Sequence, residues 1–294
     1  MDVFQQKTKI LQYETVQEFL RDFTFQKKDY ILASRSIYEA FFRDSTGRAS
    51  IAFHSDYGQG EPDDRMLDAM LKDMREKQPE RIIAIGGGSV IDCAKLFVLE
   101  GTASAEDMFL HRCTPEKSRE LIAIPTTCGS GSEVSRISIC ELTSLHTKLG
   151  LAVDALYPDQ AVLIPELLSK LPFFYFVTSG IDALIHASES FVSPKSNAYT
   201  RMFSAEAIRL LLHGFQVIAK EGEDARMRLL GDFMQASNFA GIAFGNTGTG
   251  AVHALSYPLS GIYHVTHGEA NYQFFTAVFL SLIHISEPTR LQLI

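Results

Sequence analysis

Two hydrophobic patterns divide this chain, and the change between them falls near residue 170. Before it, short continuous apolar runs such as 82–85 and 121–124 alternate with longer stretches whose apolar residues recur at every third or fourth position. A short apolar run bounded by turn residues is typical of a buried strand, whereas the longer period is typical of a helix. Strands and helices in alternation predict a parallel sheet with crossover helices.

The first part can be divided into elements on this basis. The boundaries come from proline, glycine and aspartate, since Asp63 and Asp64 are good helix N-caps and Pro79 breaks the helix before it. We expect a helix or strand–helix unit over 15–28, a strand turning into a helix over 29–42, a strand opening 49–63, a helix over 65–77, and strands at 81–85 and 121–127. This predicts an α/β, Rossmann-like domain over residues 1–170.

From residue 163 onward only the helical period remains. It runs through 176–192, 197–220 and 225–244, and several of these segments are apolar enough to be largely buried. We therefore expect an all-α domain over residues 171–280, following the α/β domain.

Composition excludes several classes of protein. The chain has 294 residues, 46% of them hydrophobic, and a net charge of −8 without any basic run, which argues against nucleic-acid binding. No apolar run approaches the length of a membrane span, and the start lacks the apolar core of a secretory signal. The four cysteines show no CxxC spacing. These features predict a cytoplasmic protein that contacts neither nucleic acid nor membrane.

Two glycine-rich loops follow predicted strands. Gly86, Gly87, Gly88 and Ser89 separate the strand 81–85 from a helix, and a second loop, "PTTCGSGSEVS", spans 125–135. Glycines at a helix N-terminus let a pyrophosphate approach free backbone N–H groups, although the first loop is not the GxGxxG fingerprint. A packed turn is the alternative for the first loop alone. In that alternative Asp92 only counters the helix dipole and Lys95 is a solvated surface charge. Two loops at neighbouring strand ends favour a nucleotide site.

Candidate metal ligands lie in the helical part. Asp182 and His186 are four residues apart, hence on one helical face, and His253 and His267 follow among glycines and small residues. One carboxylate and imidazoles suit Fe²⁺ or Zn²⁺, and the sequence does not choose between them. His264 is expected near the site without binding metal. The remaining histidines are expected to be structural, namely His54, His111, His146, His213 and His284.

Five stretches in this order resemble the iron-containing (group III) alcohol dehydrogenase family, whose architecture is shared with dehydroquinate synthases. They are "AIGGGSVIDCAK", "IPTTCGSGSEVS", "SGIDALIHASES", "FGNTGTGAVHALSYPL" and "HGEAN". The resemblance implies NAD, or NADP, bound across the glycine loops and a divalent metal between the domains. The implied metal ligands are Asp182, His186, His253 and His267. The implied dinucleotide contacts are Gly86, Gly87, Gly88, Ser89, Asp92, Thr126, Thr127, Ser130 and Lys148.

The resemblance also implies a substrate class. Residues 252–275 look most similar to family members that interconvert 4-hydroxybutyrate and succinate semialdehyde, so a short-chain hydroxy acid or alcohol is expected. The far carboxylate would meet one of Tyr257, Tyr263, His264 and Arg136. A polyol oxidoreductase like the glycerol dehydrogenases is the alternative enzyme. A nucleotide- and metal-binding fragment without catalysis is the alternative from another class. A homodimer is compatible with the resemblance.

Three departures from the family pattern change these expectations. Tyr257 stands where many relatives carry a second histidine, so Tyr257 joins His267 as a predicted catalytic residue, able to hydrogen-bond substrate or water. Arg35 stands where NAD-preferring relatives often carry an aspartate, which leaves NADP open. Relatives continue for several further helices, whereas 281–294 lose the helical period, so we expect an incomplete helical domain and a non-native tail there.

Overall fold

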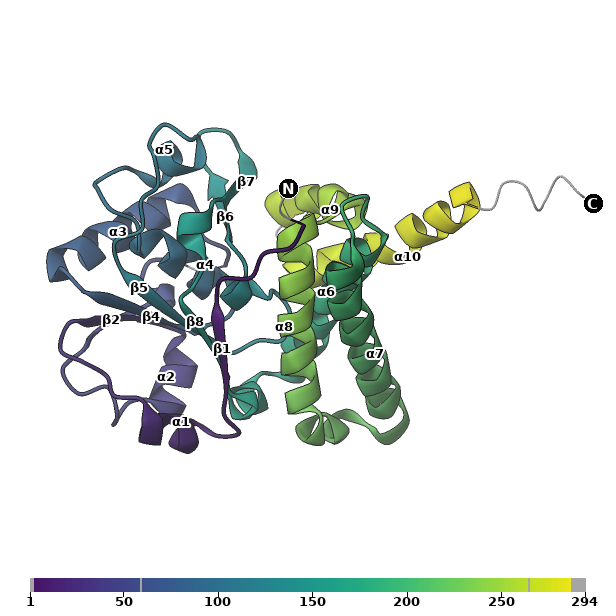
Figure 1. Ribbon diagram of the computed structural model, residues 1–294, viewed down its shortest axis with the longest axis horizontal. Coiled ribbons are helices and arrows are strands. Elements are labelled where there is room, and N and C mark those ends of the chain that lie inside the picture. Colours follow the sequence, from purple (N-terminus) through teal and green to yellow (C-terminus); the bar gives the residue numbers. More distant parts are fainter. Residues whose placement is uncertain (1–2, 59, 264, 287–294) are drawn as a thin grey trace, which may run out of the picture.

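The structure, a computed structural model, describes residues 3–58, 60–263 and 265–286. A sheet with its covering helices forms one side of the molecule and a group of long helices forms the other (Figure 1). The two sides meet along the edge of the sheet from which the loops after the strands emerge.

The main sheet is parallel throughout, with the strand order β1-β8-β5-β4-β2-β3. Its strands are β1 (Lys9–Gln12), β2 (Asp29–Ala33), β3 (Ser50–Phe53), β4 (Arg81–Gly86), β5 (Glu120–Pro125) and β8 (Gln160–Leu163). Because β4 and β5 are neighbours in register, with Gly86 opposite Pro125, the two glycine-rich loops that follow them start side by side. This register creates the shared edge that the sequence predicts.

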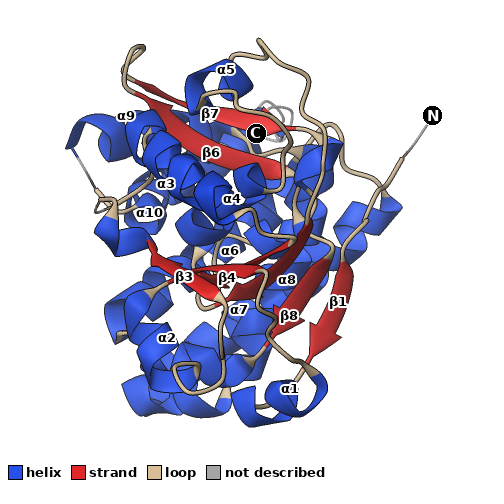
Figure 2. Cartoon of the chain, turned by 90° about the vertical axis from the view of Figure 1, so that its left-hand side faces the viewer, coloured by secondary structure: helices blue, strands red, loops and turns tan. Residues whose placement is uncertain are grey.

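Helices cover both faces of the sheet, as Figure 2 shows. One face, with Ile31, Ile83 and Ile122, packs against α1 (Val16–Asp22) and α2 (Arg35–Phe41). The other face, with Leu32, Ile82 and Leu121, packs against α3 (Asp64–Lys77), α4 (Gly88–Phe97) and α5 (Ala105–Phe109). Burial on both faces explains why these strands read as continuous apolar runs rather than as alternating patterns.

The helical side is built from α6 (Phe173–Val192), α7 (Ala198–Glu221), α8 (Leu230–Thr247), α9 (Ala251–Tyr263) and α10 (His267–Ser286). A core that includes Phe176, Leu211 and Phe233 joins α6, α7 and α8. The 3₁₀ segment η4 (Pro165–Lys170) connects β8 to this side. The predicted junction near residue 170 lies at its end, and the division into two domains stays a prediction.

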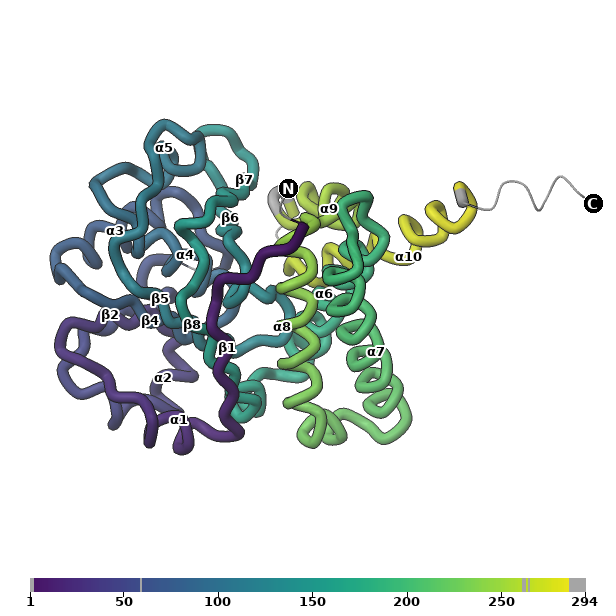
Figure 3. The backbone as a smooth tube through the Cα atoms, viewed as in Figure 1, coloured from purple at the N-terminus to yellow at the C-terminus, as the bar shows by residue number. Residues whose placement is uncertain are grey.

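The first described residues tie the two sides together (Figure 3). The segment before β1 crosses to the long helices, where the Gln5 N–H donates to Asn246 Oδ1 at 2.7 Å and Asn246 Nδ2 donates to the Gln5 carbonyl at 3.0 Å. Phe4 stacks on Phe203 and Tyr199 of α7. The segment before the edge strand β1 therefore contacts α7 and α8 on the helical side.

Most of the predicted elements are confirmed, but the hairpin of β6 (Ile137–Leu142) and β7 (Thr147–Ala152) is missing from the sequence prediction. Its buried face carries Ser138, Cys140 and Leu142, while Ile137 and Ile139 point to the less buried face. Because polar and apolar residues are interchanged in this way, no apolar alternation marks the strand. The edge strand β1 is short and largely exposed, and it gives no signal either.

Helical structure does not end where the predicted tail begins, and the non-native origin of residues 281–294 stays a prediction. Helix α10 continues through Ser286, and its last turns project from the body of the molecule (Figure 1). Neither glycine nor proline occurs between Asn271 and Ser286, so no residue in this stretch breaks the helix. Residues 287–294, the rest of the predicted tail, lie outside the described residues.

One helix qualifies the prediction that no stretch could cross a membrane. By length and composition α7 could do so, with 33% of its most apolar window buried inside the protein. A single helix of this kind is weak evidence, because core helices pass the same test. Here α7 packs along α6 and α8, and the absence of membrane contact stays a prediction.

The contact between the second glycine-rich loop and α8 gives a testable prediction. A Cβ at Gly131, where φ is +57°, would collide with the Gly241 backbone, whereas one at Gly47, with φ +58°, would meet open space. Gly131→Ala should lower the free energy of unfolding by about 2 kcal/mol more than Gly47→Ala does, because both variants carry the backbone strain but only one adds a collision. Urea denaturation measures both. Equal losses would contradict a close contact here.

Candidate active site

A cleft of about 690 Å³ runs between the edge of the sheet and the long helices. All the predicted dinucleotide contacts except Gly86 line it, as do all the predicted metal ligands and Tyr257. Gly86 instead lies at the end of β4, where a Cβ would collide with Val90. Its lack of a side chain serves the packing of the strand against α4 and not the cleft.

The two glycine-rich loops touch each other. Gly87 is the N-cap of α4 and has extended backbone geometry, so the chain enters the helix directly from β4. A Cβ on Gly88 would lie 2.8 Å from the Cβ of Ser130, and one on Gly87 would lie 3.1 Å from Thr127. The glycines therefore allow the second loop to approach the first. Both loops present backbone to the same part of the cleft, which suits an anionic ligand at the N-terminus of α4.

A buried lysine holds the second glycine-rich loop and the hairpin against α4. The alternative in which Lys95 is a solvated surface charge is wrong, because Lys95 is completely buried between α4 and the hairpin. Its Nζ donates to Ser132 Oγ at 2.6 Å, Ser135 Oγ at 3.2 Å and the Ile137 carbonyl at 2.5 Å. It also lies 3.3 Å from Asp92 Oδ1. Burial lowers the pKa of Lys95, and the Asp92 carboxylate opposes that shift.

Asp92 is therefore more than a carboxylate at the helix dipole. It accepts hydrogen bonds from Ser132 Oγ and, at 3.1 Å, from the Ile139 N–H, while its own side chain lines the cleft. Beyond Lys95, the buried Glu133 accepts a hydrogen bond from Asn238 of α8 at 2.8 Å. One polar network thus joins the first loop, the second loop, the hairpin and the helical side.

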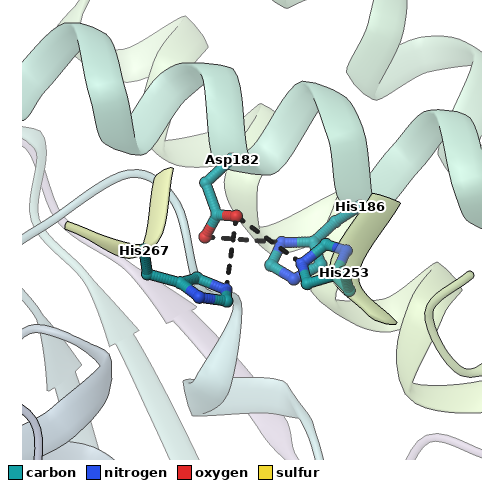
Figure 4. A group of neighbouring side chains, drawn as sticks. All are labelled: Asp182, His186, His253 and His267. Atoms are coloured by element: carbon teal, nitrogen blue, oxygen red, sulfur yellow. Dashed lines mark ion pairs between the residues drawn. The ribbon is translucent and has the colours of Figure 1, made fainter. Parts of the chain in front are cut away.

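The four predicted metal ligands come together at the other end of the cleft (Figure 4). Asp182 and His186 lie on α6, His253 on α9 and His267 at the start of α10. One ligand atom from each lies within 4.8 Å of all the others. Asp182 Oδ1 is 3.7 Å from His253 Nε2 and 3.6 Å from His267 Nε2, and Asp182 Oδ2 is 3.8 Å from His186 Nδ1.

The electrostatics of this cluster are those of a buried carboxylate among imidazoles. Burial alone would raise the pKa of Asp182, but His186, His267 and His253 hold it well below its usual range. Burial lowers the pKa of His186 to about 4, which leaves it neutral near pH 7 and able to coordinate. Burial acts the same way on His253, but the carboxylates of Asp182 and Glu189 raise the pKa of His253 to about 9.

Neighbouring polar groups hold the ligands in place. Glu189 Oε2 lies 2.7 Å from His253 Nδ1, and Glu189 also accepts the N–H groups of Gly250 and Val252 at the start of α9. Since Nδ1 of His253 faces this carboxylate, Nε2 is directed toward Asp182. Glu189 is buried and therefore supports a candidate ligand.

Asn271 was missed by sequence reasoning. Its Nδ2 donates to Asp182 Oδ1 at 2.8 Å and lies 3.1 Å from His253 Nε2 and 3.2 Å from His267 Nε2. Ser256 Oγ donates to Asn271 Oδ1 and so fixes the orientation of the amide. Asp182 Oδ1 and the Nε2 atoms of His253 and His267 thus gather around one point, as a metal site requires. The sequence feature that could have indicated Asn271 is its position one helical turn after His267, on the same face of the helix.

The other candidates occupy different places. Tyr257 lines the cleft with 36% of its surface exposed, and partial burial raises its pKa. His54, expected to be only structural, also lines the cleft. Arg136 instead pairs with Asp154 at 2.6 Å, and Tyr263 is 70% exposed. His264 lies outside the described residues.

The buried lysine gives a prediction. Lys95→Met removes the cation beside Asp92 and leaves this carboxylate, whose side chain is only 15% exposed, and the buried Glu133 without a positive charge, so it should lower the free energy of unfolding by about 3 kcal/mol or more. Lys7→Met is the matched control, because Lys7 pairs with Asp154 at 2.7 Å on the surface and should cost less than about 1 kcal/mol. Denaturant unfolding of both variants checks this. Similar small losses of unfolding free energy in the two variants would show that the polar network does not stabilise the loops.

The chain is similar to known enzymes in sequence and to solved structures in fold. The chain is 49% identical over 270 residues to the 4-hydroxybutyrate dehydrogenase of Clostridium kluyveri, covering 92% of this chain and 73% of that enzyme. It is 37% identical to long-chain-alcohol dehydrogenase 1 of Geobacillus thermodenitrificans over 67% of this chain, but spans only 50% of that relative. Its fold matches the sulfoacetaldehyde reductase of Bifidobacterium kashiwanohense, solved with NAD⁺, at a TM-score of 0.82 and 24% identity, over 96% of this chain and 76% of that one.

Family models cover nearly the whole chain. The model for iron-containing alcohol dehydrogenase matches residues 8–165, and that for the C-terminal part of the Fe-containing alcohol dehydrogenase family matches residues 176–292. The first match spans the sheet and its loops, and the second begins just before Asp182. The chain therefore belongs to the iron-containing alcohol dehydrogenase family.

Proposed function

We propose that this protein is an NAD-dependent, metal-dependent dehydrogenase that oxidises 4-hydroxybutyrate to succinate semialdehyde or carries out the reverse reduction. The observation that carries the proposal is that two glycine-rich loops and the cluster of Asp182, His186, His253 and His267 line one cleft. A dinucleotide on the loops and an alcohol at the cluster would therefore meet inside it. The 49% identity to a 4-hydroxybutyrate dehydrogenase supports the substrate.

The four side chains fit a divalent metal of the iron or zinc type. Three imidazoles and one carboxylate suit Fe²⁺ and Zn²⁺ alike, and their acceptor atoms converge on one point. A bound metal ion of this kind supplies Lewis-acid polarisation of an alcohol or carbonyl oxygen. We propose Asp182, His186, His253 and His267 as its ligands, and Fe²⁺ as the ion that the family favours.

The protein's own residues would position the reactants. The backbone of Gly87, Gly88 and Ser89 at the N-terminus of α4 would bind the pyrophosphate, with Thr126, Thr127 and Ser130 beside it. Lys148, which lies in the cleft and pairs with Glu61 at 2.5 Å, would contact the dinucleotide ribose. Holding the nicotinamide ring close to the carbinol carbon is the main requirement for hydride transfer.

Tyr257 is the proposed substrate-side residue. It lies on α9 one helical turn after His253, within the cleft, so its hydroxyl would hydrogen-bond the substrate or a water molecule beside it. A tyrosine hydroxyl is protonated at neutral pH and able to donate, and burial raises the pKa of Tyr257 further. For assembly, the homodimer stays a prediction.

The reaction is tested by following NADH formation in metal-reconstituted protein with four alcohols. We expect 4-hydroxybutyrate to exceed butanol, 1,2-propanediol and glycerol in kcat/KM. Preference for glycerol would favour the polyol oxidoreductase instead. NADH and metal binding without turnover of any of the four would favour the non-catalytic alternative.

The ligand set is tested with two histidines of the same helix. His267→Ala should lose both metal and turnover while still binding NADH, because the glycine loops are untouched. His284→Ala, an exposed position on α10, should retain both metal and turnover. Mass spectrometry measures the metal content, and NADH fluorescence measures coenzyme binding separately. Full metal content in His267→Ala would remove this residue from the set.

The role of Glu189 gives a further prediction. Glu189→Gln keeps the shape but weakens the hold on His253 Nδ1, so metal affinity should fall by about 10- to 100-fold. Glu166→Gln is the control, because Glu166 also accepts a backbone N–H, from Val16 at 2.8 Å, but contacts no candidate ligand. Competition with a chelator measures both affinities. Unchanged affinity in Glu189→Gln would make its contact to His253 incidental.

A further inference from the structure

An ion pair lies at the edge of the sheet, one strand away from the glycine loops. Arg35 is the first residue of α2, directly after β2, and β2 is the neighbour of β4 in the sheet. Asp56 ends the 3₁₀ turn η1 (His54–Asp56), directly after β3. Ser34, Ser36 and His54, the close sequence neighbours of this pair, line the cleft.

The guanidinium of Arg35 is held on two sides. Its Nη2 lies 2.5 Å from Asp56 Oδ1, and its central carbon lies 3.9 Å from the centre of the Phe53 ring. Both charged side chains remain about half exposed, 45% for Arg35 and 52% for Asp56. The pair is therefore fixed in position but accessible to a ligand that extends along the strand ends.

The position of the pair matches one end of a bound dinucleotide. In doubly wound sheets the pyrophosphate lies on the glycine loop, and the adenosine ribose extends over the end of a neighbouring strand. A carboxylate there binds the 2′-hydroxyl of NAD, whereas an arginine accommodates the 2′-phosphate of NADP. Here the chain supplies one group of each kind, paired with each other.

We propose that Asp56 sets the coenzyme preference of this protein by holding Arg35. While the pair is intact, the charge of Arg35 is balanced, and a 2′-phosphate would have to break the pair and sit beside a carboxylate. A ribose diol carries no charge and meets no such penalty, and Asp56 keeps a second oxygen for it. This rests on the proposed dinucleotide site, and it assigns NAD as the coenzyme although Arg35 alone would suit NADP.

The experiment measures Kd for NADH and NADPH by coenzyme fluorescence in the full chain. Asp56→Asn releases the guanidinium, so Kd for NADPH should fall about tenfold, the size of one charge-assisted contact. Glu206→Gln is the matched control, because Glu206 pairs with Arg209 at 2.5 Å on the exposed surface of α7. It changes net charge equally and should leave both Kd values unchanged.

A double variant separates the released arginine from a general change in charge. Arg35→Ala combined with Asp56→Asn should lose the gain in NADPH affinity. A ratio of Kd values in Asp56→Asn equal to that in Glu206→Gln would overturn the proposal, as would a gain that persists without Arg35. The binding measurement needs no alcohol substrate. A chain that binds NADH but oxidises no hydroxy acid would therefore contradict the proposed reaction, while the Kd values for NADH and NADPH would still test the role of Asp56.

Discussion

Asp182 is a carboxylate buried at the meeting point of three helices, and the geometry of the site depends on keeping it there. An unpaired buried charge would cost several kcal/mol, so its partners must be held as firmly as the charge itself. The helical repeat of α6 is enough to place His186 beside Asp182, because the two are four residues apart. His253 and His267 arrive on other elements, and each needs its own support.

Two close contacts supply that support. Glu189, two turns along α6 from Asp182, accepts backbone N–H groups at the start of α9 and contacts the ring of His253. Gly268 lets α10 approach α6, since a Cβ there would collide with the Thr178 carbonyl. Helix α6 thus carries two ligands and positions the elements that bring the other two.

The second glycine-rich loop connects the two ends of the cleft. Its Gly129 carbonyl lies 3.3 Å from His186 Nδ1, and its Ser132 contacts both Asp92 and Lys95. The same segment therefore borders the metal cluster at one end and the pyrophosphate loop at the other. The two ends of the cleft are thus connected by one continuous segment and its hydrogen bonds.

The sequence predicted the parts whose chemistry is unusual for their surroundings. Glycines after a buried strand and histidines among small apolar residues differ clearly from their neighbours, so both loops and all four candidate ligands were found. The burial of Lys95 could not be predicted, because a lysine three residues after an aspartate on a helix usually forms a surface pair, and the hairpin packed over it is what buries it. The hairpin itself was missed because its buried face carries serine and cysteine. The pairing of Arg35 with Asp56 depends on which strands are neighbours in the sheet, and no local pattern reports that.

The most direct test of this account is a crystal structure of iron- or zinc-loaded protein with anomalous diffraction measured at the metal edge. The account predicts one strong anomalous peak in the cleft, within bonding distance of Asp182, His186, His253 and His267 and facing the two glycine-rich loops. A metal ion held elsewhere, or one that leaves any of these four side chains uncoordinated, would contradict it.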